Sequence, residues 1–352
     1  MVKKVVIIGG GVAGMEAAAT LAAGGLTVTV MEKTDHLGGH LADWYHLFPD
    51  RRPGREVLQL LTKRVQEGAS VLLNCDVTDI ERNKEGFVIH TRQHPPVEAQ
   101  ALLVATGFDL FEVRKKEEYG YGIYDNIITS AELEKMLSGG QPLLTTRGTV
   151  PRRVGFVHCV GSRDAKAGNL YCSRVCCITA VKQAIEIRER LPQAEVFSFY
   201  MDLRMYGMGF EELYKEAQEK WAVNFIRGRL SEAFENQDGT LMLKVEDTLT
   251  ARPLRMNVDL LVLMAGMVPS AGTKEISRML GLELEESRFI RPRDRHMSPN
   301  RTNIPGVFIA GSCSAPKSVA DTIADARGAA VEIMTSPPAP LLERRGEKGV
   351  RS

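Results

Sequence analysis

The chain has 352 residues, enough for two domains with separate cores. Hydrophobic residues make up 44% and charged residues 25%, a composition typical of a soluble globular protein. Because 45 Lys and Arg residues face 44 Asp and Glu, the net charge of +1 argues against a nucleic-acid partner. No apolar run approaches the roughly 20 residues needed to cross a bilayer, so we expect a cytoplasmic protein whose cysteines stay reduced.

The N-terminus carries a dinucleotide-binding fingerprint. An apolar run at 5–8 predicts a buried parallel strand, and it leads into GGGVAG at 9–14 and then a run of helix formers. In this pattern Gly9 allows the tight turn, Gly11 lets a pyrophosphate approach the backbone, and Gly14 lets the helix pack closely on the strand. Strand, glycines and helix in this order argue against a signal peptide.

A second predicted strand, 27–31, ends at an acidic residue. Glu32 follows Gly14 by 18 residues, where a carboxylate can accept hydrogen bonds from the ribose hydroxyls of an adenosine. The fingerprint therefore has strand, helix and carboxylate in the expected order, which predicts a bound dinucleotide.

Three segments resemble glutathione-reductase-type flavoproteins. They are KTDHLGGHL at 33–41, LLVATG at 102–107 and VFIAG at 307–311. The resemblance implies FAD rather than NAD in the first domain, with the Gly-Gly pair passing close to the flavin. It departs at Ser312, where that class usually has Asp, which weakens the expected contact to the ribityl chain.

The middle of the chain continues as α/β structure without a second fingerprint. A strand is predicted at 154–157, but HCVGS at 158–162 follows it instead of G-x-G-x-x-G. The next expected elements are a helix at 178–191, a strand at 195–201 and a helix at 210–221. We expect a domain of dinucleotide-binding type that no longer binds a nicotinamide cofactor.

Four of the six cysteines gather in this middle region in the pattern Cys-x12-Cys-x3-Cys-Cys: Cys159, Cys172, Cys176 and Cys177. A helix N-terminus and nearby cations would stabilise thiolates there. An iron–sulfur cluster, a zinc site and thiol redox chemistry all remain open. The spacing favours the cluster, because structural zinc prefers two separated Cys pairs and an adjacent Cys pair makes a strained redox couple. Cys75 is expected to fill the core, and Cys313 to pack or to be a reactive thiol.

The stretches FVHCVGSRD…YCSRVCC, FYMDLRMYGMGFEELYKEAQEK and VNFIRGR resemble the A-type subunits of heterodisulfide reductases. The resemblance extends to about residue 334. It implies that the four cysteines bind a [4Fe-4S] cluster, and that Pro316 and Lys317 lie beside the flavin, where Lys317 would tune it. The alternative for Lys317 is a surface lysine lying over a turn. With two cysteines left over, the chain resembles the short A-type subunit of the sulfur-oxidising heterodisulfide-reductase-like complex.

Together these observations predict a thioredoxin- or glutathione-reductase-like flavoprotein of two Rossmann-like domains, the second inserted in the first. The predicted FAD domain is 1–115 with 257–334, the inserted domain is 150–256, and 335–352 is expected to be a disordered tail. The residues expected at the flavin are Gly9, Gly11, Val12, Ala13, Gly14, Glu32, Lys33, Gly38, Gly39, His40, Leu41, Val77, Ala105, Thr106, Gly107, Gly311, Ser312, Pro316, Lys317 and Ser318.

The predicted function is electron transfer through FAD and [4Fe-4S], as a homodimeric subunit with B- and C-type iron–sulfur partner subunits in oxidative sulfur metabolism. The alternatives are a flavoprotein subunit of a quinone-interacting oxidoreductase, a stand-alone NAD(P)H-dependent disulfide reductase, and a flavin- and zinc-binding scaffold.

Overall fold

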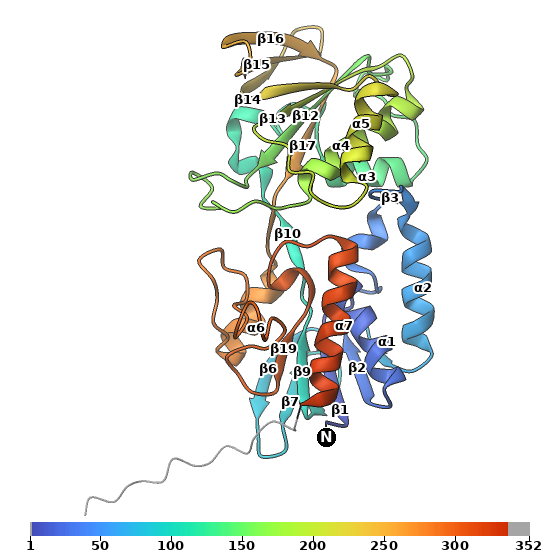
Figure 1. Cartoon of the computed structure of the whole chain (residues 1–352), viewed down its shortest axis with the longest axis vertical. Helices are drawn as coiled ribbons and strands as arrows, with labels where there is room; N and C mark the ends of the chain where they lie inside the picture. The colour runs from blue at the N-terminus through green and yellow to red at the C-terminus, as the bar shows by residue number, and fades with distance from the viewer. Residues whose placement is uncertain (1, 337–352) are drawn as a thin grey trace, which may run out of the picture. The chain divides into compact units, whose positions relative to one another are not determined.

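The computed structural model describes residues 2–336, which fold into two units (Figure 1). Within the described range, the first unit consists of residues 2–39, 58–108 and 269–336. The second consists of 40–57 and 109–268. The second unit is thus larger than the predicted inserted domain of 150–256, because it also takes in the segment 40–57 and the region from 109 onward.

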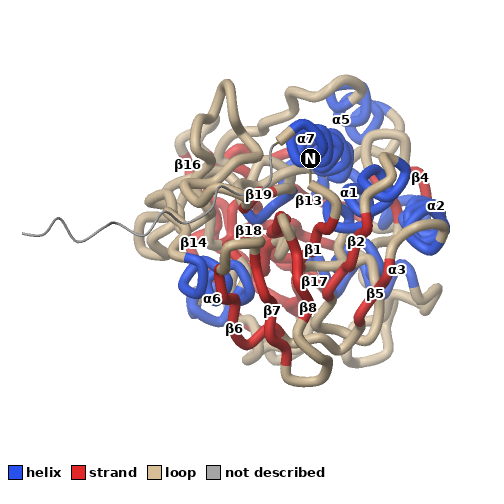
Figure 2. Tube along the Cα trace, turned by 90° about the horizontal axis from the view of Figure 1, so that it is seen from below, coloured by secondary structure: helices blue, strands red, loops and turns tan. Residues whose placement is uncertain are grey.

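The first unit is built on a parallel sheet in the order β19-β9-β1-β2-β5. Helices α1 and α7 pack side by side (Figure 2). A separate antiparallel sheet in the order β6-β7-β8 completes the unit. The elements are β1 (Lys4–Ile8), α1 (Val12–Ala23), β2 (Thr27–Met31), β5 (Ser70–Leu72), β6 (Val77–Arg82), β7 (Phe87–Thr91), β8 (Val97–Ala99), β9 (Ala101–Val104), α6 (Ala271–Leu280), β19 (Val307–Ile309), the 3-10 turn η4 (Gly311–Cys313) and α7 (Val319–Thr335).

The second unit has a seven-stranded sheet in the order β11-β17-β12-β13-β14-β15-β16. The pairs from β11 to β14 are parallel, and β15 and β16 add an antiparallel edge. The elements are η1 (Gly39–Asp43), β3 (His46–Leu47), β4 (Arg52–Pro53), β10 (Phe108–Leu110), η2 (Val113–Lys115), η3 (Glu117–Tyr119), β11 (Ile127–Thr129), α3 (Ser130–Ser138), β12 (Arg153–Val160), α4 (Cys176–Arg190), β13 (Glu195–Tyr200), α5 (Phe210–Glu219), β14 (Asn224–Glu235), β15 (Leu241–Asp247), β16 (Arg252–Val258), β17 (Leu260–Ala265) and β18 (Met267–Pro269). Helix α2 (Gly54–Gln66) begins in this unit's segment and continues into the first.

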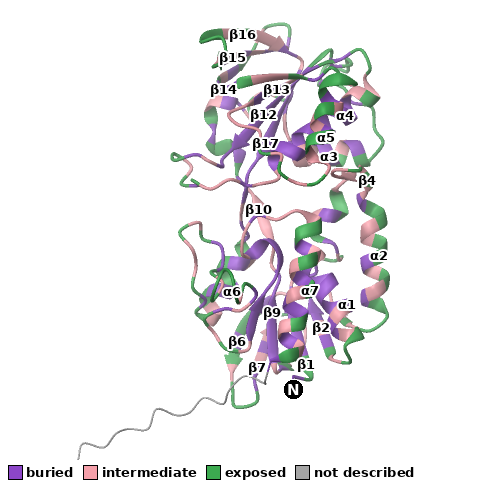
Figure 3. Cartoon of the chain, viewed as in Figure 1, coloured by how far each residue is buried: buried purple, intermediate pink, exposed green. Residues whose placement is uncertain are grey.

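Each sheet has an interior strand that is buried along its whole length, as Figure 3 shows for β9 and β17. Both strands are continuous apolar runs, the pattern that parallel strands covered on both faces require. The predicted fold class is confirmed: each unit has a parallel α/β sheet. Among residues 2–336, no helix has the length and apolar character needed to cross a membrane.

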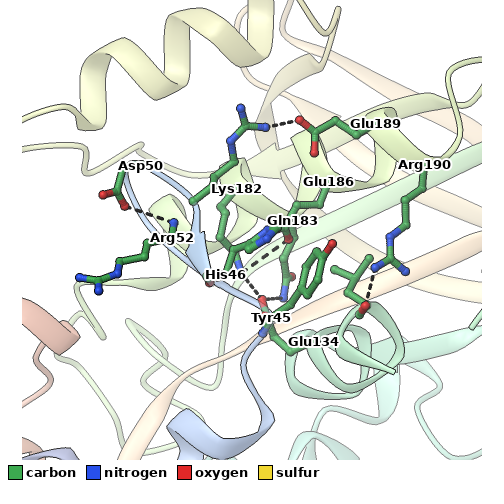
Figure 4. Close-up of polar contacts among 12 residues, drawn as sticks. Tyr45, His46, Asp50, Arg52, Glu134, Lys182, Gln183, Glu186, Glu189 and Arg190 are labelled. Atoms are coloured by element: carbon green, nitrogen blue, oxygen red, sulfur yellow. Dashed lines mark hydrogen bonds and ion pairs between the residues drawn. The ribbon is translucent and has the colours of Figure 1, made fainter. Parts of the chain in front are cut away.

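A buried polar network holds the segment 40–57 to the rest of the second unit (Figure 4). Lys182 on α4 donates to the backbone oxygen of His46 at 2.9 Å and to Glu134 on α3 at 2.5 Å. The imidazole Nδ1 of His46 lies 2.9 Å from Glu186 Oε1, and the amide of Tyr45 donates to Glu134 at 2.9 Å. These contacts explain why 40–57 groups with the second unit although its neighbours along the chain belong to the first.

Two elements extend beyond their predicted bounds in ways that matter for the cysteines. The strand expected at 154–157 continues to Val160, so that Cys159 lies within β12. The helix expected from Ile178 begins at Cys176, so that two cysteines occupy its first turn. At the C-terminus, α7 includes Thr335, and the rest of the expected tail, 337–352, lies outside the described residues.

Candidate functional site

The predicted dinucleotide residues of the first unit follow the carboxyl ends of neighbouring parallel strands. Such strand ends lie at one edge of a sheet, where α/β proteins bind nucleotides. Gly9, Gly11, Val12, Ala13 and Gly14 follow β1; Glu32, Lys33, Gly38 and Gly39 follow β2; Ala105, Thr106 and Gly107 follow β9; Gly311, Ser312, Pro316, Lys317 and Ser318 follow β19. Val77 instead begins β6 of the separate antiparallel sheet. The other two predicted residues, His40 and Leu41, lie in η1 and group with the second unit.

The three glycines of the fingerprint have different surroundings. A Cβ added at Gly9, which has φ +112°, would lie 2.4 Å from Ala105 O, and one at Gly14 would lie 1.9 Å from Gly9 O. A Cβ at Gly11 would meet nothing within 4 Å. Gly9 and Gly14 are therefore required by the protein's own packing, whereas Gly11 borders open space.

The N-terminus of α1 offers unsatisfied amides beside that space. Gly11 is the N-cap, no side chain caps the helix, and its first turn contains no acidic residue. Free amides and the positive end of the helix dipole suit an anionic group such as a pyrophosphate. The residues here fit the phosphates of a dinucleotide.

Glu32 is buried and already holds two loops together. Its Oε2 accepts the amide of Gly10 at 2.6 Å, and its Oε1 accepts the amide and hydroxyl of Thr34 at 2.9 and 2.8 Å. An ionised carboxylate has about four lone-pair sites, so about one remains for a ribose hydroxyl. The carboxylate therefore orders the loops and keeps an acceptor for the nucleotide.

Lys317 is bound within its own turn. Its ammonium donates to Gly311 O at 2.9 Å and Ser314 Oγ at 2.6 Å, and it lies 3.2 Å from Asp325 Oδ2. Asp325 also accepts the amide of Gly311 at 2.7 Å. An ammonium has three N–H donors, and these contacts occupy them, so the charge of Lys317 can act on a ligand without a direct hydrogen bond.

The cysteine region replaces the second fingerprint. The turn between β1 and α1 spans 9–11, whereas 161–175 separate β12 from α4. Cys172 lies in this longer loop, where its Sγ accepts the amide of Arg174 at 3.3 Å. The loop folds back on itself through hydrogen bonds between Asp164 and Asn169. The loop sequence contains no G-x-G-x-x-G turn for a nicotinamide dinucleotide.

The backbone of the region is strained. Cys159, Arg163 and Arg174 have φ of +58°, +54° and +61°, which residues other than glycine adopt at a cost of about 1–3 kcal/mol each. Strain of this kind persists where the surrounding structure imposes it, and it gathers at functional sites.

Three of the four predicted thiols interact directly. A hydrogen bond from Cys176 lowers the pKa of Cys159 to about 7. The same donor, helped by the neighbouring His158, lowers the pKa of Cys177 to about 4, while the pKa of Cys176 is raised well above its usual value because it donates to both. Cys159 and Cys177 therefore favour the thiolate, the form that binds metals, whereas Cys176 holds its proton as the donor between them.

Buried donors surround Cys159 without acceptors. His158 Nδ1, Ser162 Oγ and Arg163 Nη1 are buried and have no hydrogen-bond partner in the described structure. A buried donor without a partner lowers the stability of the fold by about 1–3 kcal/mol. Three such donors within six consecutive residues indicate a site where a bound group would accept hydrogen bonds from them. The sequence indicated Arg163 as a nearby cation that stabilises the thiolates, but it did not identify His158 or Ser162; the one available signal for His158 was a histidine in an otherwise apolar strand.

All six cysteines are free thiols. Within residues 2–336, no three His, Cys, Asp or Glu side chains converge as ligands of a single metal ion. Four thiolates can instead each bind a different iron of a [4Fe-4S] cluster, and the anionic sulfides of such a cluster would accept the orphaned donors. The three interacting thiols and the orphaned donors fit this group, and Cys172 would supply the fourth thiolate from the loop.

The remaining two cysteines belong to the core of the first unit. Cys313 is fully buried and donates to Val104 O at 3.2 Å and Ala310 O at 3.3 Å. Burial raises its pKa to about 12. Of the two expectations for Cys313, packing agrees with these contacts.

Comparison with known proteins identifies the family of the chain. Residues 3–137 and 178–330 match the family described as pyridine nucleotide-disulphide oxidoreductase. The unmatched interval contains Cys159, Cys172, Cys176 and Cys177. The chain resembles thioredoxin reductase from T. acidophilum, with a TM-score of 0.67 and 20% identity over 95% of this chain and 98% of that one. This likeness concerns the fold alone.

More similar sequences come from methanogens, and they are the A-type subunits of CoB–CoM heterodisulfide reductases. The chain is 44% identical over 235 residues to the A-type iron–sulfur subunit from Methanocaldococcus jannaschii, covering 65% of this chain and 36% of that protein. It is 32% identical to the A-type subunit of the ferredoxin/F420H2-dependent enzyme from Methanosarcina acetivorans, covering 94% of this chain and 53% of that protein. The chain thus spans about half or less of these relatives, and the expected resemblance to the A-type subunits is confirmed.

Proposed function

Since the chain belongs to the pyridine nucleotide-disulphide oxidoreductase family, we propose that it is an FAD- and [4Fe-4S]-containing electron-transfer subunit of a heterodisulfide-reductase-like complex. The observation that carries the proposal is the cysteine group of the second unit, where Cys176 bridges Cys159 and Cys177 beside buried donors that lack acceptors. Cys172, from the preceding loop, is the proposed fourth ligand.

The first unit supports the FAD part of the proposal. The pyrophosphate would bind in the open space at Gly11, beside the uncapped N-terminus of α1. Glu32 would accept a hydrogen bond from a ribose hydroxyl. Lys317 would place a positive charge near the flavin through the turn that it stabilises. Bound FAD would exchange electrons in pairs or singly, and the cluster would pass single electrons to partner subunits.

The partners follow from the relatives and are part of the proposal. We infer a homodimeric core with B- and C-type iron–sulfur subunits, working in the cytoplasm in oxidative sulfur metabolism. A flavoprotein subunit of a quinone-interacting complex is the second candidate, because the present residues serve either assembly equally. A stand-alone NAD(P)H-dependent disulfide reductase is disfavoured by the loop 161–175, which stands where a nicotinamide fingerprint would lie.

The test is anaerobic purification of the full chain, followed by quantitation of iron, acid-labile sulfide and flavin. Four irons, four sulfides and one FAD per chain are expected, with a broad absorption near 400 nm beside the flavin bands. Flavin without iron, in protein never exposed to oxygen, would contradict the proposal and favour thiol chemistry. Stoichiometric zinc without sulfide would instead favour the zinc-binding scaffold.

A further inference from the structure

Two side chains beside the thiols are held in place by β13 and the residues just after it. His158 Nε2 lies 2.7 Å from the hydroxyl of Ser198 in β13. Arg163 Nη2 donates to Asp202, two residues beyond the end of β13, at 2.7 Å. Each contact fixes one end of a polar side chain and leaves its other nitrogen, His158 Nδ1 or Arg163 Nη1, buried without a hydrogen-bond partner.

Both side chains lie near the sulfur atoms, and together with Cys159 they line one small cavity. His158 interacts with the thiol of Cys177, and Arg163 interacts with that of Cys159. When the Ser198 hydroxyl donates to Nε2, the Nδ1–H of the ring is available to donate to a sulfur. Ser198 and His158 are both buried, so no bulk water competes for that proton.

We propose that His158 and Arg163 are positioning residues that donate N–H···S hydrogen bonds to the cysteine-bound cluster, with Ser198 and Asp202 orienting them. This inference rests on the proposed function and deepens it, because it assigns the groups that set the cluster's reduction potential. Hydrogen bonds to the sulfurs stabilise the more negative, reduced cluster, so they raise the potential. β13 and the residues just after it thereby position the tuning groups, while β12, α4 and the loop between them supply the ligands.

The test uses the full chain, purified anaerobically, and a redox titration of the cluster followed by electron paramagnetic resonance. In His158→Phe, which removes both ring nitrogens, the ratio of reduced to oxidised cluster at a fixed potential should fall about tenfold, which is ~59 mV for one electron. Arg163→Gln should shift the ratio in the same direction. Ser198→Ala should change the ratio less, because the imidazole of His158 remains but loses the hydrogen bond that orients it.

The matched control is His46→Gln, which removes a hydrogen-bonded histidine of the same unit whose partner is Glu186 rather than a cysteine. It should keep the wild-type ratio. Unchanged ratios in His158→Phe and Arg163→Gln, with iron intact, would overturn the inference. If His158→Phe loses iron, His158→Gln is titrated in its place: retained iron with a ratio near that of the wild type supports a donor role, and loss of iron there overturns it.

Failure of the proposed function is a separate result. A wild-type chain without iron and sulfide would contradict the electron-transfer proposal before any variant is compared. A wild-type chain with its cluster, and variants with an unchanged potential, would leave that proposal standing and remove only the role of His158 and Arg163.

Discussion

Lys182 of α4 and Glu134 of α3 form an ion pair of 2.5 Å in which both side chains are almost completely buried. Glu186, also buried, lies 3.6 Å from the same ammonium. Two carboxylates thus depend on one buried cation. Such a pair adds little net stability, but removing one partner leaves charge uncompensated in the interior.

Lys182→Met should therefore lower the free energy of unfolding by about 3–5 kcal/mol. Urea denaturation at neutral pH measures the change. Lys220→Met is the control, because Lys220 pairs with Glu216 at 3.6 Å at the surface and should cost no more than about 1 kcal/mol. Equal losses in the two variants would show that the buried network does not hold the second unit together.

Substitutions at two glycines of the fingerprint should affect folding and flavin binding differently. Gly11→Ala should fold like the wild type, since its φ of −75° suits alanine and its Cβ meets nothing, yet it should lose most of its FAD because the Cβ occupies the space for the pyrophosphate. Gly14→Ala should lose both stability and flavin, because its Cβ would clash with Gly9 O. Flavin-to-protein ratios and thermal unfolding measure both properties. A Gly11→Ala chain with one FAD per molecule would place the pyrophosphate elsewhere.

Cys176 should be more important to the cluster than any cysteine outside the group. Cys176→Ala removes the thiol that bridges Cys159 and Cys177, and the variant should lose its iron and sulfide while keeping FAD. Cys75→Ala is the control, because Cys75 is also a buried thiol but lies in the core of the first unit. This variant should keep both cofactors. Unchanged iron in the Cys176 variant would show that the ligand assignment is wrong.

The raised pKa of the Cys313 thiol predicts that the free energy of unfolding falls at alkaline pH. Burial raises its pKa from an ordinary value of 9.0 to about 12, so its stabilising contribution is complete below about pH 9 and falls as the pH rises toward 12. Between pH 8 and 10.5 the contribution lost is about 2 kcal/mol. Unfolding curves of the wild type and Cys313→Ala at both pH values isolate this effect. If the difference in free energy between them stays constant with pH, the thiol titrates normally.

Much of the first unit could be predicted because its signals are local. The run at 5–8, the glycines at 9–14 and Glu32 identify strand, turn, helix and carboxylate within a few dozen residues. β1 begins one residue before its predicted start, β2 has its predicted bounds, and a helix, α1, follows the glycine turn as expected. The four cysteines were also found from spacing alone, although only the structure shows which of them interact.

The rest depended on contacts between residues far apart in the sequence. Nothing near His46 indicates that 40–57 belongs with α4, because its partner Glu186 lies 140 residues further on. His158 and Arg163 carry no recognisable motif, and their supports, Ser198 and Asp202, come from the next strand and the residues just after it. Residues whose role depends on a partner far away in the sequence produce no local or periodic sequence pattern.

The order of strands in the second unit bears on how the chain is made. β17, at 260–265, lies between β11 and β12, which are synthesised roughly 100 residues earlier or more. The ribosome must therefore have synthesised the chain beyond Ala265 before this sheet can form completely. A gene fragment that ends at 256 encodes a sheet without the interior strand that joins β11 to β12. β19 and α7 emerge later still, so the cysteine-bearing unit can complete its sheet during translation before the fingerprint-bearing unit does.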